Sequence, residues 1–338
     1  MTLTKLLLAV PNVSEGRDQA TIDAVARAFR VGTISRLLDV HSDSDHHRSV
    51  FTLAGAQGEL SQVLVAGARA AIRRIDVGEG RDRANIGAHP HVGAVDVIPL
   101  VYLDRTQRGP ACSEALVVAH EVGEGLGVPV FLYGELAQGR TRAELRRGGM
   151  QGLAERLGAG EVRPDFGPSR LHPTAGATLV AAREPLVAFN LELGASATLQ
   201  DAKRIASMIR EGGSQGLPGV RAIGVPLGAA RQEGKDADGG EHEDVDVESR
   251  KRVSPARARV RAQDTPSRHT TPQVSTNVER PLEVPLRAIV DAVREHSEIA
   301  RVELVGLAPR AALEGLPDEL VFVGGDPMAQ TIENALGF

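Results

Sequence analysis

Histidines are the clearest candidates for chemistry in this sequence, because five of the ten lie in two short segments. These five are His41, His46, His47, His89 and His91. The second segment reads Gly87-Ala-His-Pro-His-Val-Gly93, and its glycines and central proline predict a sharp loop before a buried strand. An imidazole held there titrates near neutral pH and can act as a general acid or base. A loop histidine can also serve only to hydrogen-bond the loop.

The first segment reads Asp39-Val-His-Ser-Asp-Ser-Asp-His-His-Arg-Ser49 and mixes imidazoles with carboxylates. Such ligands suit zinc or a harder cation, so one hypothesis is a metal-dependent hydrolase. Its candidate ligands are His41, Asp45, His46 and His89. A solvated polar turn is the alternative, because successive residues of an extended strand point to opposite faces. Arg48, at the entry to the next strand, can clamp a carboxylate or form a surface ion pair.

Several common chemistries lack their signatures. The single cysteine, Cys112, has small neighbours in a helical pattern, which predicts a packed side chain and excludes an internal disulfide or a CxxC site. The sequence contains no phosphate-binding P-loop, no dinucleotide fingerprint and no Gly-x-Ser-x-Gly elbow. Nucleotide-dependent and serine-hydrolase chemistry is therefore not expected.

The composition is that of an ordinary globular protein. The 338 residues are 42% hydrophobic and 25% charged, with a formal net charge of −5, which argues against a general nucleic-acid binder. The first ten residues are too short for a membrane span, which needs roughly 20 apolar residues, and they lack the basic start of a signal peptide. We therefore expect a cytoplasmic protein that binds neither nucleic acid nor membrane.

The hydrophobic pattern alternates between strand and helix periods. In the first half it predicts strands at 6–10, 33–40, 49–53 and 94–101, with helices following Asp18 and at 60–75. This β-α-β-β-α-β order is the ferredoxin-like split unit, extended by a helix at 112–126 and a strand at 128–133. The same order returns with strands at 185–193, 220–227, 273–278 and 302–307 and helices at 202–209 and 286–293. The prediction is an α+β fold of two such subdomains.

Two segments interrupt this pattern. Residues 163–176 are rich in Pro and Gly and predict a connector at a domain junction, where ligand clefts are common. Residues 228–271 hold an acidic run and then a basic run with few apolar side chains, which predicts a disordered insertion. We accordingly predict an N-terminal subdomain at 1–177, ending in the connector at 163–177, and a C-terminal subdomain at 178–338.

The chain resembles the formiminotransferase family along most of its length outside the insertion. The motifs that carry the resemblance are Val10-Pro-Asn-Val-Ser-Glu-Gly16, Arg48-Ser-Val-Phe-Thr52, His89-Pro-His-Val-Gly-Ala-Val-Asp-Val97, Val128-Pro-Val-Phe-Leu-Tyr-Gly-Glu135, Pro164-Asp-Phe-Gly-Pro168, Gly176-Ala-Thr178, Ala188-Phe-Asn190, Gln273-Val-Ser-Thr-Asn277 and Glu303-Leu-Val-Gly-Leu307. The sequence departs from the mammalian type at His41 and His47.

The resemblance implies transfer of a formimidoyl group from formiminoglutamate to tetrahydrofolate, with folate in a tunnel between two ferredoxin-like subdomains. It implies His89 as the catalytic base and Asp39 and Arg48 as supporting residues. It implies a folate-binding stretch made of Gly167, Pro168, Ser169, Arg170, Leu171, His172, Pro173, Thr174, Ala175 and Gly176. It further implies small-molecule substrates, no metal, and a homodimer. A formyl donor, a glycine-based donor and a non-catalytic folate-binding module stay open as alternatives.

Overall fold

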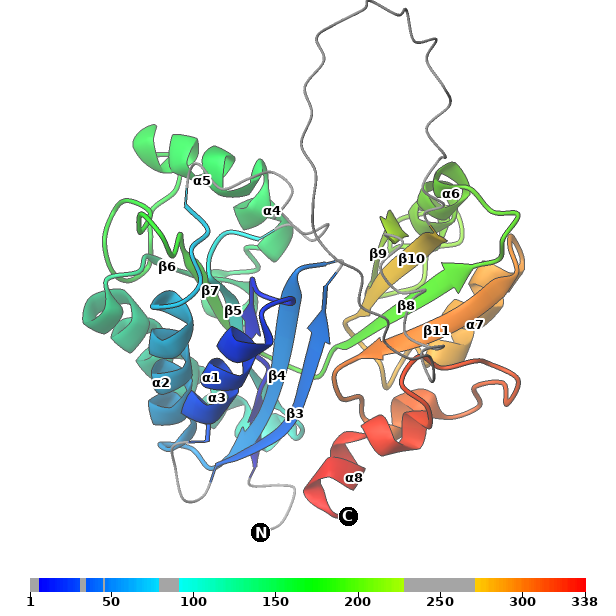
Figure 1. Ribbon diagram of the computed structural model, residues 1–338, viewed down its shortest axis with the longest axis horizontal. Coiled ribbons are helices and arrows are strands. Elements are labelled where there is room, and N and C mark those ends of the chain that lie inside the picture. Colours follow the sequence, from blue (N-terminus) through cyan, green and yellow to red (C-terminus); the bar gives the residue numbers. More distant parts are fainter. Residues whose placement is uncertain (1–5, 31–34, 45, 79–90, 228–270) are drawn as a thin grey trace, which may run out of the picture.

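The computed structural model describes residues 6–30, 35–44, 46–78, 91–227 and 271–338. It contains two β-sheets with helices packed against them, so the predicted α+β class is confirmed. The two sheets lie side by side, the first with its helices on the left of Figure 1 and the second on the right. Within the described part of the chain, no helix has the length and apolar character needed to span a bilayer.

The first sheet follows the order β1-β4-β2-β5-β7-β6, with β3 paired to β4. Its strands are β1 (Leu7–Ala9), β2 (Asn12–Val13), β3 (Arg36–Asp43), β4 (Arg48–Gly55), β5 (Val95–Tyr102), β6 (Val130–Leu132) and β7 (Thr178–Arg183). The pairs β5–β7 and β6–β7 are parallel, whereas β1 to β5 pair antiparallel to one another. Strands β6 and β7 therefore extend a predicted antiparallel core.

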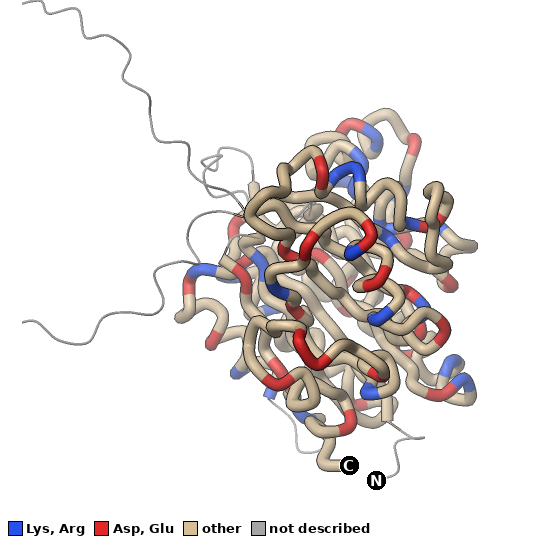
Figure 2. Tube along the Cα trace, turned by 90° about the vertical axis from the view of Figure 1, so that its right-hand side faces the viewer, with Lys and Arg blue, Asp and Glu red and all other residues tan. Residues whose placement is uncertain are grey.

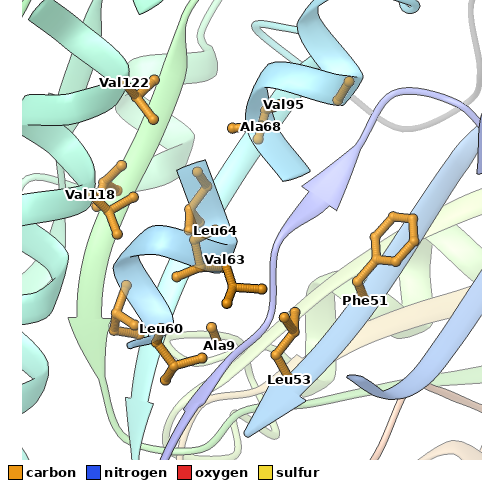
Figure 3. Packing of buried hydrophobic residues seen from close by; sticks show 14 of the residues in the cluster. Ala9, Phe51, Leu53, Leu60, Val63, Leu64, Ala68, Val95, Val118 and Val122 are labelled. Carbon is orange, nitrogen blue, oxygen red and sulfur yellow. The ribbon is translucent and has the colours of Figure 1, made fainter. Parts of the chain in front are cut away.

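Helices cover one face of this sheet and bury its core. They are α1 (Gln19–Ala28), α2 (Leu60–Ile72) and α3 (Arg108–His120), the last continued by a π-helical turn at Glu121–Gly125. Helix α1 begins after Asp18, as predicted, because the Asp18 carboxylate accepts the Ala20 N–H at 3.1 Å. Figure 3 shows Phe51 of β4 with Leu64 and Val118 of the helices, all fully buried. Each such side chain contributes about 1.5–3 kcal/mol of hydrophobic stabilisation.

The second sheet is antiparallel throughout, with the order β11-β8-β10-β9. Its elements are β8 (Val187–Leu193), α6 (Leu199–Ile209), β9 (Val220–Leu227), β10 (Thr271–Val278), α7 (Leu286–Arg294) and β11 (Ile299–Val305). Every one of these overlaps a predicted element. Alternation along β8 places Phe189 and Leu191 in the core with Ile205 and Ile289 of the helices.

The faces of the two sheets that point away from this packing are turned toward each other. Leu8, Ala54 and Val101 of the first sheet form a small apolar cluster with Ile332. Ile332 begins helix α8 (Ile332–Leu336), so the C-terminal segment closes one end of the junction. Elsewhere between the sheets lies a pocket that is lined by residues of both sheets.

Several elements differ from the prediction. Helices α4 (Arg142–Arg146) and α5 (Gly149–Gly158) were not predicted, nor was β7, which hydrogen-bonds to β5 and β6. Residues 178–183 therefore belong to the first sheet, although the predicted division assigned them to the second subdomain. Short helical turns occur at Arg105–Gln107, Gly134–Ala137, Arg310–Leu313 and Pro327–Gln330. The predicted insertion lies outside the described residues except for Thr271, which begins β10.

Candidate active site

A pocket lies between the two sheets and is lined from both sides; we call it the intersheet pocket. Its cavity volume is about 40 Å³, and the pocket is open to solvent. Its lining residues are His41, Asp43, His46, Arg48, Val50, Ala188, Asn190, Ser275, Asn277 and Val305. Half of them come from β3, β4 and the turn between, and half from β8, β10 and β11. Ligand sites favour such junctions.

A smaller pocket adjoins it, because His46 and Arg48 line both; we call it the histidine pocket. Its lining residues are Val13, Ser14, His46, His47, Arg48, His91 and Asp96. The predicted catalytic residue His89 lies outside the described residues. His91, two positions later, is the first residue of the chain described after that gap.

Arg48 begins β4 and is the one arginine or lysine that lines both pockets in the described part of the chain. Burial, followed by the charge of the neighbouring Arg146, lowers the pKa of its guanidinium to about 10. Its Nε is buried without a hydrogen-bond partner in the described part of the chain. Arg48 as a whole is half-buried, and an arginine with an unpaired N–H donor is well suited to an anionic ligand such as a carboxylate.

A β-bulge directs Asp96 into the histidine pocket. Asn12 pairs with Val97 and Val13 with Val95, so the register shifts by one residue at Asp96. Bulges re-aim a side chain in this way, and they are common beside active sites. The Asp96 carboxylate is almost fully buried and pairs with Arg146 of α4.

The strand β2 segment forms another wall of the histidine pocket. A Cβ at Gly16 would lie 2.2 Å from the Asp43 carbonyl oxygen and 2.5 Å from the Arg48 nitrogen, so only glycine allows this close approach. The Gly16 N–H donates to His47 Nδ1 at 3.2 Å. Ser14 is held at the wall because its hydroxyl donates to the Gly93 carbonyl at 2.7 Å.

Asp39 and His41 lie two residues apart in β3 and therefore share a face. Burial raises the pKa of the Asp39 carboxyl, although the charge of nearby His41 partly offsets the rise. The His41 ring reaches across to the second sheet, with Nε2 3.6 Å from Glu303 Oε1. Asn190 also donates to Glu303, at 3.1 Å.

Strand β3 extends through Asp43, whereas the sequence predicted a polar link from His41 to His47 between two strands.

The end of the connector packs against the residues that precede β5. In the predicted folate-binding stretch 167–176, His172 and Gly176 exchange two backbone hydrogen bonds of 2.9 Å. The Ala175 carbonyl accepts the Ala94 N–H at 2.9 Å, which places this turn against the residues that follow His91. None of the ten residues of this stretch lines either of the two pockets.

Comparison with known proteins identifies the type of protein to which these pockets belong. Residues 6–183, more than half of the chain, match the formiminotransferase domain, N-terminal subdomain. The chain belongs to the formiminotransferase family. The chain is 37% identical over 229 residues to glutamate formimidoyltransferase of Streptococcus pyogenes serotype M1, covering 67% of this chain and 74% of that enzyme. The suspected family is confirmed.

Of two other relatives, one is also named glutamate formimidoyltransferase and the other is a longer formimidoyltransferase-cyclodeaminase. The formiminotransferase is 37% identical over 210 residues to glutamate formimidoyltransferase of Thermoplasma acidophilum, covering 67% of that enzyme. It is 39% identical over 234 residues to formimidoyltransferase-cyclodeaminase of Sus scrofa, but spans only 41% of that protein.

The structure brings some predicted site residues of the formiminotransferase together. His41, His46 and Arg48 meet at the intersheet pocket, whereas Asp39 lies beside His41 and does not line it. Four further lining residues were not predicted from the sequence: Asp96, Asn190, Ser275 and Asn277. Asn190 and Asn277 stand in motifs shared with the family, and polar residues alternate with apolar ones in both strands; these were the available signals.

The metal hypothesis gains no support from the described residues of the formiminotransferase. No group of three or more His, Cys, Asp or Glu side chains there could hold a metal ion. His46 Nδ1 instead lies 2.6 Å from Asp43 Oδ2. Two of the four predicted ligands, Asp45 and His89, lie outside the described residues. Burial raises the pKa of the Cys112 thiol, which disfavours a nucleophilic thiolate.

Proposed function

We propose that the protein transfers a formimidoyl group from N-formimidoyl-L-glutamate to tetrahydrofolate, releasing L-glutamate and 5-formimidoyltetrahydrofolate. Such a transfer belongs to histidine degradation and one-carbon metabolism. The observation that carries the proposal is the match of residues 6–183 to the formiminotransferase domain. The relatives named glutamate formimidoyltransferase supply the donor. The metal-dependent hydrolase is not favoured.

In the proposed reaction the folate N5 amine attacks the amidine carbon of the donor and a C–N bond forms. The tetrahedral intermediate then breaks its other C–N bond, to the glutamate nitrogen. His89 takes the proton from the attacking amine and returns it to the departing nitrogen, so charge and atoms balance. Arg48 binds a donor carboxylate, and Asp39 acts as a supporting residue beside His41. Holding both substrates together removes much of the entropic cost of the encounter.

The proposed folate site is the connector stretch 167–176. Its support is the hydrogen bond between the Ala175 carbonyl and the Ala94 N–H, which brings the stretch close to the residues that follow His91. The proposal includes two ferredoxin-like subdomains with the ligand tunnel between them. The strand orders β5-β2-β4-β3 and β11-β8-β10-β9 support this architecture. We place the division after Arg183 rather than at 177/178, because β7 pairs with β5.

The direct test is a glutamate-release assay with formimidoylglutamate and tetrahydrofolate. His89→Ala is expected to lower kcat by about two to four orders of magnitude. The matched control, His120→Ala at the exposed end of α3, is expected to leave turnover unchanged. Folded wild-type protein that releases no glutamate would rule out this substrate pair. Full turnover in His89→Ala would rule out the base assignment.

Two broader predictions belong to the same proposal, a homodimer and a cytoplasmic location.

Charges of both signs are mixed over the side of the molecule drawn in Figure 2, where Lys and Arg stand among Asp and Glu. That mixture favours small-molecule substrates over nucleic acid, which selects continuous basic surfaces. Size-exclusion chromatography with light scattering tests the dimer.

A further inference from the structure

The second sheet presents an ordered array of side chains to the intersheet pocket. In the β8–β10 register Ser275 lies opposite Asn190, and Asn277 lies opposite Ala188. In the β8–β11 register Val305 also lies opposite Ala188. All five residues line the pocket. Directly opposed residues share a face of the sheet. Asn190 and Ser275 therefore form a polar row, and Ala188, Asn277 and Val305 form a partly apolar row beside it.

The array offers two kinds of contact. Ala188 and Val305 form an apolar floor, and Val50 of the first sheet faces them across the pocket. Ser275 and Asn277 are only half buried, and neither side chain hydrogen-bonds to another residue in the described ranges. Their hydroxyl and amide are available as donors. The surface therefore suits a short aliphatic chain that ends in a hydrogen-bond acceptor.

The opposite wall supplies the charge. Arg48 enters the pocket from β4, and its Nε is buried without a hydrogen-bond partner in the described part of the chain. A ligand that fills the pocket should therefore carry a carboxylate for Arg48, a short apolar stem, and a second acceptor for Ser275 and Asn277. A glutamyl group has this composition, since two methylenes separate its α-carbon from the side-chain carboxylate. A glycyl group lacks both the stem and the second carboxylate.

We propose that the intersheet pocket binds the glutamyl moiety of the donor, with the α-carboxylate on Arg48 and the side-chain carboxylate on Ser275 and Asn277. This assignment rests on the proposed function and makes the second sheet the determinant that selects glutamate over glycine. The two methylenes lie on Ala188, Val305 and Val50.

Folate also carries a glutamyl group, so the same chemistry has two sources. In the donor, the reactive amidine is bonded to the α-nitrogen and stands next to the α-carboxylate. In folate, an aromatic p-aminobenzoyl group separates the glutamate from the reacting nitrogen. Arg48 also lines the histidine pocket together with His91, which lies two residues after the proposed base His89 in the sequence. A glutamyl group bound at Arg48 therefore belongs to the donor.

The test compares formimidoylglutamate and formimidoylglycine as donors for one set of variants. Asn277→Asp sets a carboxylate against the donor's side-chain carboxylate, and we expect kcat/KM for the glutamate donor to fall about 100-fold. The glycine donor should change less than about threefold, because it does not reach this wall. Ser275→Ala should lower the glutamate value by about tenfold through one lost charge-assisted hydrogen bond. Asn334→Asp, at an exposed position of α8, is the matched control and should change neither value.

The outcomes separate this inference from the function on which it rests. No transfer from either donor by the wild type would contradict the proposed function. An equal loss for both donors, or a raised KM for tetrahydrofolate with an unchanged donor KM, would overturn the assignment of the pocket to the donor. Ser275→Ala and Asn277→Ser keep the wall uncharged and supply the same comparison if Asn277→Asp does not fold.

Discussion

Arg146 of α4 and Asp96 at the bulge of β5 form an ion pair in which the carboxylate is buried and the arginine side chain is only 13% exposed. The same Asp96 carboxylate also accepts the Val92 N–H at 2.9 Å. One side chain therefore ties a helix to the chain segment that enters β5 directly after His91. Because Asp96 and His91 line the histidine pocket, the pair links fold stability to the geometry of the candidate site.

Replacing Asp96 by alanine should be strongly destabilising. The change leaves the Arg146 charge buried without its carboxylate, and breaking a buried pair in this way costs about 3–5 kcal/mol. The free energy of unfolding, measured by urea titration, checks the value. Glu184→Ala is the control, because its pair with Arg105 is exposed and should contribute no more than about 1 kcal/mol. Equal losses for the two variants would contradict the role given to burial.

Asp39→Asn should increase stability while decreasing turnover. Burial raises the pKa of Asp39 above its ordinary 3.8, so the folded protein binds a proton more readily than the unfolded chain. Stability therefore falls as pH rises from 3.8 through the folded-state pKa, and the cost is fully present at neutral pH. The asparagine variant removes that cost, and the gain should disappear below pH 3.8. Thermal unfolding at pH 3 and pH 7, together with the glutamate-release assay, measures both effects. A neutral-pH loss of stability would contradict this prediction.

The fold could be predicted where local patterns decide it. The Asp18 cap and the apolar stripe of Ile22 and Val25 define α1 without reference to the rest of the chain. Strand β7 was missed because it follows a connector of uncertain length, and its neighbours β5 and β6 are distant in the sequence. Its pairing depends on tertiary contacts that periodicity does not carry.

Part of the site was predicted, and the rest was missed because, like the pairing of β7, it depends on tertiary contacts. The entry of Arg48 into a strand, and its suitability for carboxylates, were evident from residue type and position. Asp96 could not be predicted, because a one-residue bulge sets its direction and strand alternation alone would have placed it differently. Asn190 and Ser275 stand in motifs shared with the family, but they were not predicted to line the pocket because that placement depends on two sheets facing each other.

Gly16→Ala should disrupt the histidine pocket. Its Cβ would lie within 2.5 Å of backbone atoms of Asp43 and Arg48, which cannot move as a flexible side chain could. Displacement of this segment should reduce stability by about 1–3 kcal/mol and turnover by at least about tenfold. Gly158→Ala in α5 is the matched control, since nothing lies within 4 Å of its Cβ and helix propensity should favour alanine. Wild-type turnover in Gly16→Ala would show that the close approach does not shape the site.

Arg48 substitutions separate charge from geometry. Arg48→Lys keeps a cation but loses the planar fork, so the donor KM should rise about tenfold. Arg48→Met removes the charge and should raise it by about 100-fold or more. The pKa of Arg48 is about 10, so its charge should not change the pH dependence of the wild-type donor KM between pH 6 and 9. Above pH 10 the guanidinium loses its proton, and the donor KM should rise. Steady-state kinetics across pH measures each value, with the KM for tetrahydrofolate as the internal control. A rise confined to the tetrahydrofolate KM would place Arg48 on the folate instead of the donor.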